Sequence, residues 1–284
     1  MNLRVNGAPV VRVDYYDSFH RARFDATMGL LRRYGGGRVV EVGGHPWAMT
    51  SRLIAERDIH LEATVSASEV TTWSDELPVT TQNYQLELDN RRAAFKNISA
   101  NIERTLFPIG VEVDVVMACE IIEHLTRSPH IMMLNINGWL KTGGLVIITT
   151  PNGAQLENPF RVVSKVPNYR SSLYSRHNYL FSMDGLCDLV ESCGFEVIET
   201  SFWSPFARRG LSKLRPILAR LGPQYLKNKF GQTLCVVARK VETRHSASRM
   251  PKVYGREPGW ECVEYPDDCV WEHDTPVGET VEAR

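Results

Sequence analysis

Two carboxylates and an imidazole stand close together after one apolar segment of the chain. Glu120, Glu123 and His124 are spaced i, i+3 and i+4 behind the apolar run at 113–119. On a helix that begins where this run ends, the spacing places all three side chains on one face. Carboxylates and an imidazole are suitable ligands for a divalent cation such as Mg²⁺. We therefore predict metal ligands at these positions. In the alternative, His124 is a packed structural residue and the glutamates face water.

Short apolar runs alternate with amphipathic segments, which predicts βαβ units and a parallel sheet. The predicted strands are 38–42, 59–65, 98–102, 113–119, 145–150, 195–200 and 233–238. The predicted helices are 19–34, 47–57, 121–140 and 182–193. A turn at 141–144 separates the third helix from the strand that follows it. In such a sheet, ligands bind outside the carboxyl ends of the strands.

Three segments fit this alternation less well. The polar stretch at 71–90 is interpreted as an insertion with a candidate strand at 83–88. Basic and apolar residues interleave at 204–229, which predicts a helical insertion that either caps the sheet or forms a surface for an anionic substrate or membrane lipid. The residues after 241 are rich in charges, Pro and Gly. We predict one domain over 1–241, with its cap at about 204–230, and a C-terminal extension over 242–284 that is either extended over the domain or disordered.

Composition bounds the function. The 284 residues contain 33 Lys+Arg and 33 Asp+Glu, so the formal net charge is zero, and the basic excess of a nucleic-acid-binding protein is missing. No uncharged apolar run approaches the ~20 residues of a membrane-spanning helix. We expect a soluble, cytoplasmic protein whose six cysteines are reduced, because none forms a C-x-x-C pair. Cys262, Cys269 and His273 are the alternative, a zinc site of unusual spacing.

The segments that follow the strands resemble class I S-adenosylmethionine-dependent methyltransferases, in the bacterial branch with a Glu-His-Leu motif after the fourth strand. The resemblance covers about 19–240. It is carried by VVEVGGHPW at 39–47, DVVMACEIIEHL at 114–125, LKTGG at 140–144 and IITTPN at 147–152. It implies a Rossmann-like, doubly wound, mostly parallel seven-stranded sheet with helices on both faces. A dinucleotide is not expected, because G-x-G-x-x-G cannot be read after 39–42 and the chain has no P-loop.

The resemblance also implies which residues bind the cofactor. Glu41 is expected to face its ammonium group, and the turn at Gly43, Gly44 and His45 to approach its methionine part. This turn departs from the family pattern, since His45 and Trp47 stand where two further glycines are expected. Ser66 replaces the usual ribose-binding acid, with Glu69 as a substitute. Asn101 is expected at the adenine, or else is a plain surface asparagine. Cys119 and Glu120 complete the set.

The acceptor side is inferred in the same way. The segment YSRHNY at 174–179 resembles the family's R-H-N segment, which makes His177 a candidate base beside His124. A base and a metal suit a hydroxyl acceptor, because a hydroxyl is a poor nucleophile at neutral pH. We therefore expect O-methylation of a small molecule, a saccharide or secondary metabolite, with Trp47, Trp203 and Tyr179 as stacking faces.

Three alternatives remain open at this point. The altered glycine turn and the missing ribose acid would suit an inactive, methyltransferase-like binding or scaffold module. The basic segment at 204–229 would suit a lipid-linked substrate at a membrane. Nucleic-acid methylation ranks last, because the net charge is zero and no N-P-P-Y or P-C motif follows the fourth strand.

Overall fold

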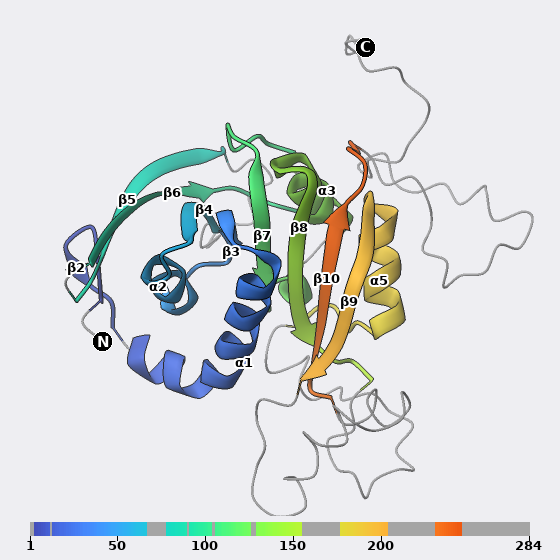
Figure 1. Ribbon diagram of the computed structural model, residues 1–284, viewed down its shortest axis with the longest axis horizontal. Coiled ribbons are helices and arrows are strands. Elements are labelled where there is room, and N and C mark those ends of the chain that lie inside the picture. The colour runs from blue at the N-terminus through green and yellow to red at the C-terminus, as the bar shows by residue number, and fades with distance from the viewer. Residues whose placement is uncertain are drawn as a thin grey trace, which may run out of the picture.

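A computed structural model describes residues 3–11, 13–66, 78–89, 91–103, 106–125, 129–154, 177–203 and 231–245. Within these ranges the chain forms one mixed ten-stranded sheet, in the order β2-β1-β5-β6-β4-β3-β7-β8-β10-β9 (Figure 1). The strands are β1 (Leu3–Val5), β2 (Ala8–Pro9), β3 (Gly37–Val42), β4 (Ile59–Ser66), β5 (Thr80–Leu88), β6 (Arg91–Ser99), β7 (Val113–Cys119), β8 (Leu140–Pro151), β9 (Phe195–Trp203) and β10 (Thr233–Lys240).

The centre of the sheet is parallel, as predicted. β6, β4, β3, β7 and β8 run in one direction, and β10 is antiparallel to both β8 and β9. From β3 the chain builds outward through β4 to β6, and then returns to place β7 on the other side of β3. The connections therefore leave in opposite directions at the carboxyl ends of β3 and β7, where a doubly wound sheet opens a crevice for ligands.

The prediction of seven strands is wrong for the sheet as a whole. The three strands beyond those seven are β1, β2 and β5, all at the edge beyond β6, and β5 confirms the candidate strand at 83–88 within a longer span. β5 forms a long hairpin with β6, paired from Thr80 opposite Ser99 to Leu88 opposite Arg91. Leu86 is the one fully buried residue of β5, so the alternation that marks a strand is faint. The same hairpin shows that the strand predicted at 98–102 in fact runs from 91 to 99.

The described helices are α1 (Val13–Tyr34), α2 (Ala48–Ala55), the 3₁₀ turn η1 (Ile122–His124), α3 (Pro129–Trp139) and α5 (Met183–Ser192). The single helix predicted over 121–140 is wrong. Glu120 has a left-handed φ of 58° and Leu125 is extended, so η1 is isolated on both sides. Pro129 then opens α3 at a position where its missing N–H costs nothing.

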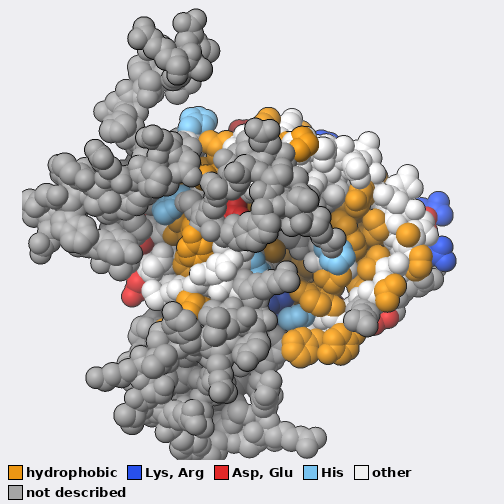
Figure 2. All heavy atoms as spheres, turned by 180° about the vertical axis from the view of Figure 1, so that it is seen from behind, with side chains coloured by type: hydrophobic (Ala, Val, Ile, Leu, Met, Phe, Trp, Pro, Cys, Tyr) orange, Lys and Arg blue, Asp and Glu red, His pale blue; other side chains and the backbone are white. Residues whose placement is uncertain are grey.

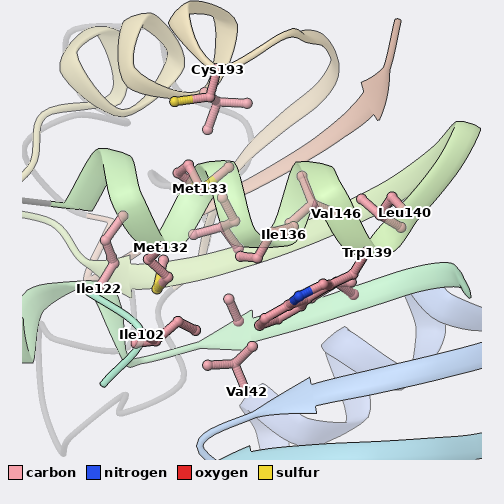
Figure 3. Packing of buried hydrophobic residues seen from close by; sticks show 14 of the residues in the cluster. Val42, Ile102, Ile122, Met132, Met133, Ile136, Trp139, Leu140, Val146 and Cys193 are labelled. Carbon is pink, nitrogen blue, oxygen red and sulfur yellow. The ribbon is translucent and has the colours of Figure 1, made fainter. Parts of the chain in front are cut away.

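The helices cover the sheet on both faces. Alternate strand residues such as Val39, Val115 and Ile147 pack with α1 and α2, and their neighbours Val40, Val116 and Ile148 pack with α3 and α5. Figure 3 shows the layer between the sheet and the α3 and α5 side, where the side chain of Trp139, the last residue of α3, points toward the strands. Its indole N–H donates a hydrogen bond to the Phe107 carbonyl at 2.7 Å. The two faces explain why the central strands are apolar throughout.

Several sequence predictions lie outside the described residues. These are the basic segment at 204–230, the extension from 246 onward, Glu69, and the Cys262, Cys269 and His273 set. The domain boundary at 241 therefore stays a prediction. None of the described helices combines the length and the apolarity needed to cross a bilayer. Cys119, Cys187, Cys193 and Cys235, the described cysteines, are free thiols.

Candidate functional site

The turn after β3 brings the backbone against the end of β7. Gly43 has a φ of 81°, and its N–H donates to the Val65 carbonyl at 2.7 Å. A Cβ added at Gly43 would lie 2.0 Å from the Cδ1 atom of Ile121, which follows β7. Both the left-handed conformation and the lack of space require glycine here.

The rest of the turn is built without the two further glycines of the family pattern. The His45–Pro46 peptide is cis, and Trp47 has a left-handed φ of 69°. The Trp47 N–H donates to the Gly44 carbonyl at 2.6 Å, which closes the turn in front of α2. The indole is 9% exposed and packs against Tyr84 and Phe95. The expectation that Trp47 stacks on an acceptor is therefore wrong, because the ring anchors the turn to the β5–β6 hairpin.

Glu41 is a buried acid beside this turn. Its carboxylate accepts a hydrogen bond from the Thr50 hydroxyl at 2.5 Å. Burial raises its pKa to about 7, and the bond from Thr50 offsets part of that rise. A cation brought next to Glu41 would favour its charged form.

A cleft opens at the carboxyl ends of β3 and β7, with about 380 Å³ of empty volume that is partly continuous with solvent. It is lined by Tyr16, Arg23, Phe24, Glu41, Val42, Gly43, Gly44, His45, Pro46, Ala48, Met49, Met117 and Cys119. Five predicted cofactor residues are among them: Glu41, Gly43, Gly44, His45 and Cys119. Figure 2 shows a face of the molecule on which hydrophobic and histidine side chains gather.

Helix α1 contributes lining residues that the sequence analysis missed. Tyr16, Arg23 and Phe24 are spaced by seven and eight residues, so they share one face of the helix. The same periodicity marks the packing face of any amphipathic helix, so it does not by itself distinguish a ligand-lining residue from a core residue. A basic residue at position 23, within an apolar stripe, was the available signal.

Ser66 and Asn101 do not line this cleft. The Ser66 hydroxyl donates to the Asn97 side chain at 3.3 Å, and the Asn101 side chain accepts from the Glu103 N–H at 3.3 Å. Their contacts with the ribose and the adenine stay predictions.

A second group of polar side chains lies next to the end of β7. Suitable ligand atoms of Glu123, His124 and His177 all lie within 4.8 Å of one another. Glu123 is 1% exposed, and its Oε2 accepts from the Thr150 hydroxyl at 3.0 Å. Its Oε1 is buried without a hydrogen-bond partner, as is Nδ1 of His177. The alternative in which the glutamates face water is thus wrong for Glu123.

The backbone of Glu123 holds the segment that carries His177. Its carbonyl accepts from the N–H groups of Asn178 at 2.7 Å and Tyr179 at 3.2 Å. The rings of His124 and His177 then meet edge to face, with centroids 4.8 Å apart. Burial, and next the neighbouring His124, lower the pKa of His177 below its ordinary value. The imidazole is therefore neutral at neutral pH and able to accept a proton.

Glu120 is separated from this group. The helix that would have aligned it with Glu123 and His124 does not form, and its Oε2 instead pairs with Nη1 of Arg23 at 2.9 Å. Glu120 still influences its neighbour electrostatically: burial, and next the charge of Glu120, raise the pKa of Glu123. The structure thus brings together Glu123, His124 and His177, and of these three only Glu123 and His124 belong to the predicted metal set.

Known proteins resemble this chain in sequence and in fold. A family described as "Methyltransferase domain" matches residues 9–200. An S-adenosylmethionine-dependent methyltransferase from Mesorhizobium loti superposes with a TM-score of 0.50 at 13% identity, over 77% of this chain and 97% of that one. The N-methyltransferase NodS from Bradyrhizobium japonicum gives a TM-score of 0.48 at 11% identity, over 80% and 98%. No curated protein sequence matches.

Replacement of Gly43 by alanine should close the turn. The new Cβ would be forced against Ile121, so we expect the free energy of unfolding to fall by about 2 kcal/mol or more and ligand binding in the cleft to be lost. Gly29→Ala is the matched control, because its Cβ meets nothing within 4 Å inside α1. It should be neutral or stabilising by about 0.5–1 kcal/mol. Equal urea midpoints for the two variants would contradict the assignment.

The buried acid should also leave a signature in the pH dependence of stability. The pKa of Glu41 is about 7 in the folded chain against 4.5 ordinarily, so the folded state keeps a proton that the unfolded state loses. The protonated Glu41 side chain therefore adds on the order of 3 kcal/mol to the free energy of unfolding below about pH 4.5. This addition is lost as the pH rises to about 7. In urea unfolding at pH 5 and pH 8, Glu41→Gln should abolish this fall. Glu196→Gln, a change at an exposed residue, should leave the fall in the free energy of unfolding between pH 5 and pH 8 in place. Equal falls in the wild type and in Glu41→Gln would contradict the raised pKa of Glu41.

Proposed function

The chain belongs to the class I S-adenosylmethionine-dependent methyltransferases, and from that premise we propose that it methylates a hydroxyl group of a small molecule. The observation that carries the choice of a hydroxyl is the group formed by Glu123, His124 and His177 at the end of β7. It offers a neutral imidazole and a buried carboxylate beside the cleft strands. An unactivated alcohol needs such groups more than an amine does.

We assign the cofactor to the cleft between β3 and β7. When bound, S-adenosylmethionine supplies a methyl group on a sulfonium that leaves readily. Gly43 and Gly44 let the backbone approach its methionine part, and Glu41 is placed to accept hydrogen bonds from its ammonium group. Cys119 lines the same cleft with its thiol protonated, because burial raises its pKa to about 12. We keep Ser66 and Asn101 as proposed contacts of the ribose and the adenine.

The chain then needs chiefly to position the acceptor and to remove its proton. The acceptor oxygen must lie in line with the methyl carbon and the sulfur. In the proposed step the O–H bond breaks, its proton passes to His177 or His124, the oxygen forms a bond to the methyl carbon, and the carbon–sulfur bond breaks. S-adenosylhomocysteine is the second product. Because its pKa is lowered, His177 is neutral at neutral pH, and a ring nitrogen is available to accept that proton.

A divalent cation would fit the same group. Oε1 of Glu123 and Nδ1 of His177 are buried ligand atoms of the right kind. Neither has a hydrogen-bond partner, and Oε1 of Glu123 lies 3.8 Å from Nε2 of His124. The two imidazoles suit a first-row transition metal better than the expected Mg²⁺, which prefers oxygen ligands, and the carboxylate is a suitable ligand for Mn²⁺ as a probe. When bound, the cation would stabilise negative charge on the acceptor oxygen. Glu123, His124 and His177 would hold it, while Glu120 stays with Arg23. Metal binding is therefore an alternative to the imidazole base, because a nitrogen that binds the cation cannot also accept the proton.

The proposed acceptor class is a saccharide or a related secondary metabolite. Tyr179 and Trp203 are half-buried and stay candidates for stacking, whereas Trp47 is occupied by the core. The inactive-scaffold alternative loses part of its motivation, because the altered turn still lines an open cleft together with the buried acid Glu41. The lipid-linked alternative depends on the segment at 204–229, which lies outside the described residues.

Calorimetric titration of the full chain with S-adenosylhomocysteine tests the cofactor assignment. We expect micromolar binding, followed by methyl transfer from S-adenosylmethionine to hydroxylated sugars in a labelled-methyl assay. Glucose and glucosamine form a matched pair of acceptor probes, because glucosamine has an amine in place of one hydroxyl of glucose. Transfer that requires the amine would contradict O-methylation. No binding by the folded chain would favour the scaffold alternative.

The histidine–glutamate group has its own test. We expect Glu123→Gln to weaken Mn²⁺ binding about tenfold or more, as followed by the electron paramagnetic resonance signal of free Mn²⁺. His177→Ala should lower turnover by about 10²–10⁴-fold, because it removes the base. His60→Ala is the control, since His60 is exposed and stands beside Glu62 on β4. Unchanged Mn²⁺ binding in Glu123→Gln, with turnover indifferent to chelator, would refute the metal assignment.

A further inference from the structure

One ion pair in the cleft is poorly suited to a purely structural role. Arg23, on α1, is 4% exposed and lines the cleft, and its partner is Glu120 at the end of β7. The described contact joins only one nitrogen to one oxygen. Nε of Arg23 and Oε1 of Glu120 are both buried without a hydrogen-bond partner. A buried ion pair that stabilises a fold normally satisfies these remaining atoms.

The backbone of Glu120 adds a second anomaly. Its φ of 58° is a left-handed backbone conformation that residues other than Gly, Asn and Asp seldom adopt. Backbone strain of this kind tends to occur at binding sites and switch regions. The conformation points the chain away from the helix that its own sequence predicts, and the carboxylate reaches back to Arg23.

The cofactor carries a group that matches Arg23 better than Glu120 does. Its methionine part is a zwitterion, and Glu41 on the wall of the same cleft is placed for the ammonium. Among the described lining residues, Arg23 is the only Lys or Arg. A guanidinium can bind a free carboxylate through two parallel hydrogen bonds, which would use the unpartnered Nε.

We propose that Glu120 is an internal counterion that occupies the cofactor-carboxylate position on Arg23, and that the bound cofactor displaces it. This inference rests on the proposed function. It adds that Glu120 competes with the cofactor carboxylate for Arg23. Before binding, Glu120 neutralises a guanidinium that cannot lose its charge in the buried wall. On binding, the carboxylate takes over Arg23. The two residues therefore act in opposite directions on affinity.

S-adenosylmethionine and its decarboxylated form test this on the full chain, because the two ligands differ only in the carboxylate. Calorimetry of the wild type should give a preference of about ten- to a hundredfold for the carboxylated ligand. Arg23→Gln should reduce that ratio to about one, and Arg23→Lys should retain part of it. Glu120→Gln should tighten the binding of S-adenosylmethionine severalfold and increase the ratio.

Arg52→Gln is the matched control. The guanidinium of Arg52 lies over the same Phe24 ring at the same 5.4 Å as that of Arg23, but it pairs with Asp17 and does not line the cleft. Arg52→Gln should leave the ratio of the affinities for S-adenosylmethionine and its decarboxylated form unchanged. If Arg23 and Glu120 only brace α1 against β7, both substitutions weaken both ligands equally and the proposal is overturned. A wild type that binds neither ligand refutes the proposed function as well, whereas a ratio kept in Arg23→Gln refutes the inference alone.

Discussion

The close approach of Gly43 to Ile121 is the constraint on which the site depends. β3 and β7 are adjacent parallel strands, so the residues that follow them leave the sheet at the same edge. The turn after β3 can pass in front of β7 only because Gly43 has no side chain at the point of contact. That passage opens the cleft on one side. On the other side it leaves room for η1 and the residues that η1 carries.

Burial of charge is the second organising feature. Glu41 and Glu123 lie in the wall of the sheet with their pKa values raised, mainly by burial. Such acids destabilise a ligand-free fold at neutral pH unless a cation approaches them. The cofactor's ammonium would approach Glu41, and a metal would approach Glu123. The same property that weakens the empty chain would strengthen its complexes.

The additional strands at the far edge support the turn as well as extending the sheet. β5 and β6 present Tyr84 and Phe95, whose rings contact each other, and the buried Trp47 packs against both. In the family pattern glycines make the turn compact by having no side chains. Here the hydrogen bond from the Trp47 N–H to the Gly44 carbonyl and the large anchored ring close a turn at the same place. The hairpin and the altered turn are therefore parts of one arrangement.

Local patterning was sufficient for the central strands, because residues buried on both faces of a parallel sheet form apolar runs that need no distant partner to be recognised. β7 appears at its exact bounds, and Glu41, Gly43, Gly44, His45 and Cys119 reach the cleft as the order of the segments predicted. The β5 strand was predicted only as a candidate at 83–88, since few of its side chains are buried and only Leu86 is fully so.

Contacts between distant segments decided the rest. A helix after β7 suits the spacing of Glu120, Glu123 and His124, yet Glu120 lies beside Arg23, 97 positions earlier, and His177 arrives 53 positions after His124. The energy of placing these charged and polar groups in a buried wall exceeds a local helical preference of a few tenths of a kcal/mol per residue. Residue spacing therefore identified the reactive groups, and tertiary electrostatics determined which of them meet.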